Sequence, residues 1–309
     1  MNLLNFFTKS YTLLHNYPCV PFWALTPFRR FIRNGANKCL PFYLSKHKKK
    51  VKGNAKGNGV IVSFTSFPAR INNVWMVVES LKNQSLLPEK IILWLSKDQF
   101  PTKDTIPDSL WDEEDELFEI RMVDGDIRSH KKFFYVLQKF PDKAFITCDD
   151  DIYYHPDMLK HIVDTSKFYP KCIVANTTRC ISYDRDGNLL PYNQWKKNKI
   201  KFKKEKLIQI GVGGVLYPPN TLYDITLQKN LFLELTPMAD DIWLNAMARL
   251  KGTPVVQSNW EFIPLPIFSR SSSLSSVNKG ENMNDIQLKS LRDYLRSNYR
   301  DIYSLKEKQ

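Results

Sequence analysis

The chain contains 309 residues, of which 43% are hydrophobic and 13% aromatic, proportions that suit a globular protein and exclude a disordered chain. Its formal net charge of +13 would by itself suit a nucleic-acid-binding protein, but the charge is unevenly distributed. Residues 1–58 contain eleven Lys and Arg and no Asp or Glu, whereas residues 59–309 contain 34 basic and 32 acidic residues. The basic character therefore belongs to the N-terminal segment, and the body is nearly neutral.

The N-terminal segment, residues 1–58, mixes aromatic with basic side chains and ends in a lysine-rich stretch at 46–52. A segment of this composition suits the anionic surface of a cytoplasmic leaflet, where each Lys or Arg contributes about 1 kcal/mol. The alternative is an irregular extension that packs on the body and ends in a solvated linker. Membrane-surface contact is thus one of two interpretations.

The cysteines, the apolar runs and the first residues of the chain indicate in which cellular compartment the protein is expected. The five cysteines are an odd number without CxxC spacing, which favours a reducing environment over a disulfide framework or a zinc site. The apolar runs fall short of the roughly 20 residues that a bilayer-spanning helix needs, and no basic residues precede the apolar start, as they would in a signal peptide. We therefore expect a cytoplasmic protein, with peripheral contact to the inner face of the cell membrane left open.

From residue 59 onward, short apolar strands alternate with amphipathic helices. Strands are expected at 59–65, 90–95, 118–123, 144–148 and 172–175, with a late strand at 255–258. Helices are expected at 72–84, 131–140, 156–168, 239–250 and 284–297. This alternation predicts an α/β fold with a mostly parallel central sheet flanked by helices. Ligands of such sheets bind beyond the carboxyl ends of the strands.

Three consecutive acids, Asp149, Asp150 and Asp151 (the Asp triplet), directly follow the fourth expected strand. Their mutual repulsion must be offset, and a hard cation such as Mn²⁺ or Mg²⁺ does so with carboxylate and phosphate oxygens as ligands. Side chains alternate along a strand, so Asp149 and Asp151 are expected on one side and Asp150 on the other. The alternative is an acidic turn that caps the following helix.

Two further groups of residues are candidates for a role in catalysis or binding. Asp240 and Asp241 open an expected helix, where the helix dipole tolerates and fixes carboxylates, and either one could take a proton from an acceptor hydroxyl. Gly213 and Gly214 lie in the run Gly-Val-Gly-Gly, where the missing Cβ atoms would let the backbone approach a sugar. The alternatives are that the two acids only cap the helix and that the glycines only form a bend.

The segment from Phe145 to Leu159 resembles the metal-binding segment of GT-A-fold glycosyltransferases. Residues 80–85 and 90–94 are similar to the first helix and second strand of that fold. The set is most similar to enzymes of bacterial surface-polysaccharide gene clusters, and more remotely to exostosin-like transferases, over roughly residues 59–290. The resemblance implies a Rossmann-like GT-A catalytic domain at 59–309, with a nucleotide-binding half at 59–152 and an acceptor-binding half at 153–309.

The same resemblance assigns roles to individual residues. Asp151 would coordinate the metal that bridges the donor diphosphate, and Asp149 would contact the ribose or share the metal. Residues after the first strand would lie near the nucleotide, namely Thr65, Ser66 and Arg70. Lys131 would reach the diphosphate, with His130 and Lys132 as competing choices.

One feature departs from the family pattern. Many GT-A enzymes supply a late metal ligand, often a histidine, whereas all five histidines here precede residue 162. A later contact would have to come from Ser269–Ser276 or from residues 282–285, or be absent.

The function expected from these features is metal-dependent transfer of a hexose from a nucleoside-diphosphate sugar, of UDP type, to a carbohydrate or lipid-linked acceptor in surface-polysaccharide biosynthesis. In that reaction the basic residues 196–206 would contact an anionic acceptor or a lipid diphosphate, the alternative being a solvated loop. A metal-dependent nucleotidyltransferase is a second interpretation. Such an enzyme would require a glycine-rich phosphate loop near the start of the fold, and the sequence has none there. A polyanion- or RNA-binding protein is a third, and it leaves the Asp triplet unexplained, so no nucleic-acid partner is expected.

Overall fold

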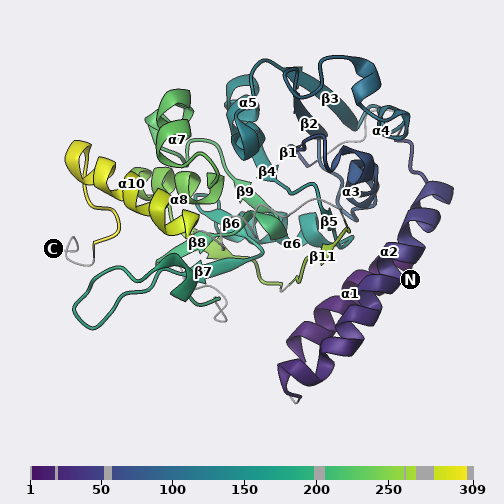
Figure 1. Ribbon diagram of the computed structural model, residues 1–309, viewed down its shortest axis with the longest axis horizontal. Coiled ribbons are helices and arrows are strands. Elements are labelled where there is room, and N and C mark those ends of the chain that lie inside the picture. The colour runs from purple at the N-terminus through teal and green to yellow at the C-terminus, as the bar shows by residue number, and fades with distance from the viewer. Residues whose placement is uncertain are drawn as a thin grey trace.

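The computed structural model describes residues 2–17, 20–51, 58–197, 206–260, 262–268 and 282–304. Most of the basic stretch 196–206 and all of Ser269–Ser276 lie outside these residues. Within them, the chain forms a mixed α/β body from which a pair of helices projects (Figure 1).

A seven-stranded sheet forms the centre of the body, in the order β10-β6-β9-β4-β1-β2-β3. Neighbouring strands run parallel except at β9, which is antiparallel to both β4 and β6. The strands are β1 (Val60–Thr65), β2 (Lys90–Ser96), β3 (Phe118–Val123), β4 (Ala144–Thr147), β6 (Ile173–Ala175), β9 (Val215–Tyr217) and β10 (Val255–Gln257). The α/β architecture with a mostly parallel sheet, predicted from the alternating pattern, is confirmed.

The central strands β1, β2 and β4 are mostly apolar and buried along almost their whole length, because both faces of the sheet are covered. On β1, Val62 and Phe64 belong to one core and Ile61 to the other, as side-chain alternation requires. The first core receives α3 (Val74–Lys82) and α6 (Met158–Phe168). The second receives α5 (Lys131–Lys139), α7 (Lys229–Leu235), α8 (Asp240–Lys251) and α10 (Met283–Asn298).

Two small antiparallel sheets lie beside the main one and were not expected from the sequence. One pairs β5 (Ile152–Tyr153) with β11 (Leu265–Pro266), and the other pairs β7 (Thr178–Cys180) with β8 (Leu207–Gln209). A short helix, α4 (Asp108–Trp111), lies between β2 and β3. Strands of two or three residues give too short a pattern for period-two reasoning, and their pairing depends on distant partners.

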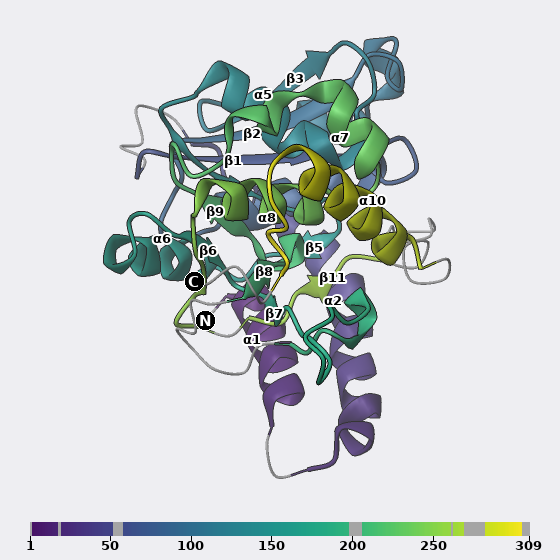
Figure 2. The same ribbon diagram turned by 90° about the vertical axis from the view of Figure 1, so that its left-hand side faces the viewer.

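The described part of the N-terminal segment is helical, so the expectation that the extension is irregular is wrong, although the extension does pack on the body. Helix α1 (Leu3–Asn16), the 3₁₀ turn η1 (Phe22–Leu25) and α2 (Thr26–Lys46) form a hairpin, named here the helical hairpin. Apolar residues spaced by three or four bury one stripe on each helix, including Leu4 and Phe7 on α1 and Leu40 and Leu44 on α2. Figures 1 and 2 show the bend of this hairpin at the end farthest from the main sheet. No helix in the described part of the chain is long and apolar enough to cross a bilayer.

Candidate functional site

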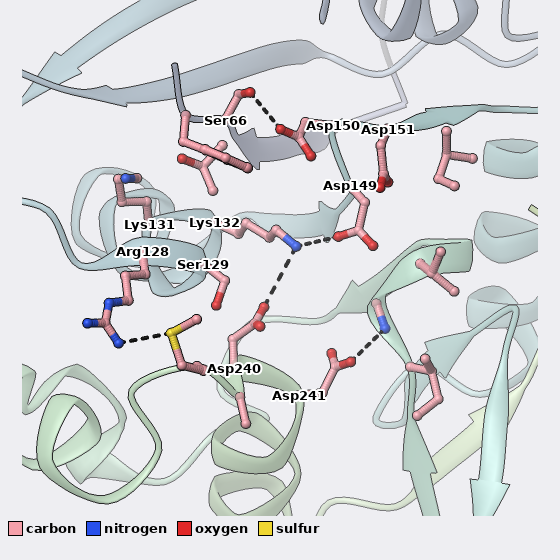
Figure 3. A pocket seen from close by; sticks show the side chains of 18 of the residues that line it. Ser66, Arg128, Ser129, Lys131, Lys132, Asp149, Asp150, Asp151, Asp240 and Asp241 are labelled. Atoms are coloured by element: carbon pink, nitrogen blue, oxygen red, sulfur yellow. Dashed lines mark hydrogen bonds and ion pairs between the residues drawn. The ribbon is translucent and has the colours of Figure 1, made fainter. Parts of the chain in front are cut away.

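A pocket of about 870 Å³ opens where β1 and β4 end and where α5 and α8 begin. This is the carboxyl edge of the parallel strands, where ligands of such sheets are expected. Predicted residues that line it are Thr65, Ser66, Arg70, Lys131, Asp149, Asp150, Asp151, Asp240 and Asp241. The fold therefore brings together acids that are about ninety positions apart in the sequence (Figure 3).

The Asp triplet lies just beyond the end of β4 and is held by residues that follow β1. Asp150 accepts hydrogen bonds from the Ser66 hydroxyl at 2.6 Å and from Arg70 Nη1 at 2.7 Å. The same Nη1 forms an ion pair with Asp151 at 2.9 Å. Asp150 is thus a buried residue that joins the loop after β1 to the triplet. The expected alternation fails because β4 ends at Thr147, so the triplet is no longer strand.

Lys132, at the start of α5, links the triplet to α8. Its ammonium group contacts the carboxylate of Asp149 and lies 3.9 Å from that of Asp240 (Figure 3). Burial opposes the charge on Lys132, but Asp149 and Asp240 outweigh it, and the pKa of this lysine is raised. Lys131, the residue preferred from the sequence, also lines the pocket, but its ammonium group is paired with Asp126. Of the two lysines, Lys132 is the one that contacts a triplet carboxylate.

Asp240 and Asp241 form the first turn of α8 and face the triplet across the pocket (Figure 3). The Asp241 carboxylate accepts a hydrogen bond of 2.9 Å from the backbone N–H of Gly211. Burial, reinforced by the charge of Asp240, raises the pKa of Asp241 to about 8. The two neighbouring acids therefore have different environments, one beside a lysine and one beside a backbone amide.

The glycine run forms a tight 3₁₀ turn, η6 (Gly211–Gly213), between β8 and β9. Gly211 and Val212 line the pocket, whereas Gly213 and Gly214 do not. A Cβ on Gly213 would lie 2.9 Å from Thr177 Oγ1, and Gly214 has a φ of +88°. These two glycines are needed for the turn itself, and their predicted contact with the donor stays a prediction.

Thr65 and Ser66 hold the loop after β1 in place. The Thr65 hydroxyl donates to the carbonyl oxygen of Trp94 on β2 at 2.8 Å, and Ser66 donates to Asp150. Their proximity to a nucleotide stays a prediction.

The acids of the triplet and of α8 outnumber the cations that pair with them. Among the described residues, Asp149, Asp150, Asp151, Asp240 and Asp241 line the pocket, and two cations, Arg70 and Lys132, lie within ion-pair distance of these acids. Burial and the neighbouring charge of Asp149 raise the pKa of Asp151 to about 6. These residues fit a hard divalent cation, because its charge would offset the repulsion between carboxylates.

The described residues contain no group of three or more His, Cys, Asp or Glu side chains arranged to hold a metal by themselves. Asp149 and Asp151 would therefore hold a cation together with oxygens of its ligand, the usual arrangement for Mg²⁺ on a diphosphate. Of the residues expected to supply a later contact, Asn284 lines the pocket, and Asp285 accepts a hydrogen bond from the backbone N–H of Tyr192 at 2.6 Å.

Several lining residues were missed by the sequence analysis. They come from α1, from the loop before α5 and from the β7–β8 region, and they include Tyr11, Asp126, Arg128, Ser129, Arg179 and Tyr192. Arg128 has a φ of 54°, an unusual conformation for a residue with a side chain. No local pattern marks these positions, because tertiary folding alone brings them to the pocket.

No protein-family model and no curated protein sequence matches the chain. Among solved structures, it is similar to glucosyl-3-phosphoglycerate synthase from Mycobacterium tuberculosis in complex with Mn²⁺, UDP and phosphoglyceric acid, with a TM-score of 0.42 and 12% identity over 79% of each chain. It is also similar to UDP-glucose pyrophosphorylase complexed with UDP-glucose, with a TM-score of 0.38 and 10% identity over 77% of this chain and 98% of the other. A third structure, 4-diphosphocytidyl-2C-methyl-D-erythritol synthase, gives a TM-score of 0.38 and 10% identity over 73% and 98%.

Proposed function

We propose that the chain is a metal-dependent glycosyltransferase of the GT-A type that moves a sugar from a nucleoside-diphosphate sugar to a hydroxyl acceptor. The observation that carries this proposal is the arrangement of the pocket, in which the Asp triplet and the first turn of α8 face each other with Lys132 between them. A donor diphosphate fits the triplet side, where Asp149 and Asp151 would share a cation with it.

On the triplet side, Asp149 and Asp151 would hold Mn²⁺ or Mg²⁺, and this cation would offset the charge that develops on the leaving diphosphate. Arg70 keeps Asp150 and Asp151 in place through its two ion pairs. Lys132, buried beside Asp149, adds a fixed positive charge on the same side of the pocket.

On the α8 side, Asp241 is proposed to take the proton of the acceptor hydroxyl as that oxygen attacks the anomeric carbon. A general base works best with a pKa near the working pH, and the pKa of Asp241 is raised to about 8 by burial. Its hydrogen bond from Gly211 fixes the direction of the carboxylate. Asp240, the competing candidate, lies nearer to Lys132 and is proposed to position it.

The finer assignment follows the sequence resemblance. We propose a UDP-sugar as donor, a hexose as the transferred group, and a carbohydrate or lipid-linked acceptor in surface-polysaccharide biosynthesis. The division into a nucleotide-binding half at 59–152 and an acceptor-binding half at 153–309 belongs to the same proposal.

Calorimetric titration with UDP, with and without Mn²⁺, tests the metal site. We expect Mn²⁺-dependent UDP binding in the unaltered chain, its loss in Asp151→Asn, and its retention in Asp241→Asn, which should lose sugar transfer. Asp186→Asn, at an exposed acid outside the pocket, is the control and should bind UDP normally. Full activity of Asp151→Asn would show that the metal site is placed wrongly.

A donor panel of nucleotide sugars, assayed for release of the nucleoside diphosphate, tests the reaction class. Formation of pyrophosphate from a nucleoside triphosphate and a sugar phosphate, without release of a nucleoside diphosphate, would instead identify a nucleotidyltransferase.

A further inference from the structure

The far end of the helical hairpin exposes large aromatic side chains to solvent. Trp23 is 76% exposed and Phe31 74%, and the neighbouring exposed aromatic residues are Tyr17, Phe22 and Phe28. All five lie within the fifteen-residue span 17–31, around the bend that Figures 1 and 2 place farthest from the sheet. We name this group the aromatic tip. A local concentration of exposed apolar side chains on one element marks an interaction surface.

The aromatic side chains continue along one side of α2. Phe28, Phe31, Lys38 and Phe42 recur at intervals that return to the same face of a helix, and all four are exposed. The opposite stripe, which contains Ala36, is buried. Helix α2 therefore has two apolar stripes. One is buried against the rest of the fold, and the second, aromatic one is not covered by any of the described residues.

The charge of the hairpin identifies the surface that it fits. The described hairpin residues 2–17 and 20–46 contain six Lys and Arg and no acid. Arg29 is buried and donates to the carbonyl oxygens of Leu14 and Phe22, so it serves the fold of the bend. Lys9, Arg30 and Lys38 are exposed and available to an anionic partner. Aromatic residues that are interleaved with cations suit the interface of an anionic bilayer.

We propose that the aromatic tip docks on the surface of an anionic lipid bilayer, with Trp23, Phe28 and Phe31 entering the headgroup region. The protein would lie on the membrane rather than cross it. This goes beyond the charge argument from the sequence, because it assigns the contact to one end of one hairpin and not to the lysine-rich stretch that follows it.

Docking at the tip is connected to the pocket through the middle of the two hairpin helices. Tyr11 of α1 lines the pocket, and Asn37 of α2 donates to the carbonyl oxygen of Pro266 and accepts from the N–H of Phe268, at 2.9 and 2.7 Å. Pro266 lines the pocket as well. Resting on the proposed function, this connection favours an acceptor that is itself held in the membrane.

Vesicle sedimentation tests the proposal directly and needs neither donor nor metal. The probes are vesicles of phosphatidylcholine with phosphatidylglycerol in a ratio of about 3:1, and vesicles of phosphatidylcholine alone. We expect binding to the anionic vesicles that weakens as salt is added. The triple variant Trp23→Ser, Phe28→Ser, Phe31→Ser should bind at least about tenfold more weakly.

The chain offers a matched control in Phe168→Ser, since Phe168 is 79% exposed but lies on α6 in the body. It should bind vesicles like the unaltered chain. A second variant, Arg30→Glu with Lys38→Glu, leaves the apolar surface intact and should lose the salt-sensitive part of binding, which keeps the test decisive if the triple variant does not fold.

Several outcomes would overturn the proposal. They are no vesicle binding by the unaltered chain, equal binding by the triple variant, or a dimer that dissociates in the triple variant while vesicles have no effect, which would assign the tip to a second copy of the chain. Asp151→Asn should bind vesicles normally. Failure of the catalytic proposal is thereby separated from failure of this one.

Discussion

Lys132 occupies a position that determines how the acids of the pocket are arranged. Its ammonium group contacts Asp149 of the triplet and lies 3.9 Å from Asp240 of α8, two acids that are far apart in the sequence. Carboxylates that are half-buried and close together repel one another, and a lysine shared between them offsets that repulsion.

Removing this lysine should therefore destabilise the protein. We expect Lys132→Met to lower the free energy of unfolding by about 3–5 kcal/mol, because it leaves two carboxylates without their shared partner. Added Mn²⁺ should recover part of the loss, since a cation replaces the missing charge. Urea unfolding with and without Mn²⁺ measures both effects.

Lys139→Met is the control, because Lys139 is exposed at the end of the same helix. It should change the free energy of unfolding by less than about 0.5 kcal/mol. An equal loss in both variants would contradict the role given to Lys132.

At the scale of elements, the turn η6 decides where Asp241 points. Gly211 donates its N–H to Asp241, and the turn that presents it closes only because Gly214 adopts a φ of +88°. A Cβ at position 214 would lie 3.0 Å from the sulfur of Met158 on α6. The turn is thus squeezed between α6 and α8, and a side chain at position 214 meets both backbone strain and a steric neighbour.

We expect Gly214→Ala to lower the free energy of unfolding by about 1–3 kcal/mol, because it combines a positive φ with this close contact. Gly59→Ala separates the two causes. Gly59 has a φ of +78°, but a Cβ added there would have no heavy atom within 4 Å, so only the backbone strain applies. Thermal unfolding of both variants should show the larger loss at Gly214, and the reverse order would exclude packing against Met158 as a cause.

The sequence predicted the bounds of individual helices and strands better than the pairing between strands. Strands β1, β2 and β3 and helices α3, α6 and α8 were expected within a few residues of their observed bounds, because each carries its own periodicity. Strand β9 escaped the prediction although it lies in the middle of the sheet. Its three residues form no pattern, and only its neighbours β4 and β6 define it as a strand.

At the scale of the whole molecule, a buried cluster of charges joins the stretch after the hairpin to the body. The fully buried Glu79 of α3 accepts hydrogen bonds from the backbone N–H of Lys49 at 3.3 Å and lies beside Glu113. Lys48 pairs with Glu113 at 2.7 Å, and the buried Lys82 pairs with Asp115 at 2.9 Å. Burial, together with the neighbouring Glu113, raises the pKa of Glu79 to about 8.

This cluster predicts a loss of stability with rising pH. The pKa of Glu79 is higher in the folded chain than its ordinary value of 4.5, so folding favours the protonated form. Its contribution is fully present below about pH 4.5 and is lost as the pH rises through about 8. We expect the melting temperature of the unaltered chain to fall between pH 6 and pH 9, and to fall less in Glu79→Gln.

Glu89→Gln provides the comparison, since Glu89 is exposed and pairs with Lys143. Its melting temperature should follow that of the unaltered chain over the same pH range. Identical pH dependence in the Glu79 variant and the unaltered chain would contradict a proton held at this position.

The sequence by itself determined the class of fold, the division between a basic N-terminal segment and a neutral body, and the identity of most of the acids that line the pocket, Asp126 being the exception among the described residues. These properties depend on local periodicity, on composition and on consecutive residues, which one chain displays without any contact. Asp149 and Asp151, as well as Asp240 and Asp241, are therefore recognisable as candidate site residues from their positions in the chain alone.

Only the tertiary structure decided which charges meet. Arg70 joins Asp150 to Asp151, Lys132 rather than Lys131 joins Asp149 to Asp240, and Tyr11 reaches the pocket from the hairpin. Each of these contacts depends on how separate elements are placed relative to one another, which the periodicity within one element does not specify. Whether a buried charge is neutralised depends on which segments the fold brings together, and the sequence alone does not specify this.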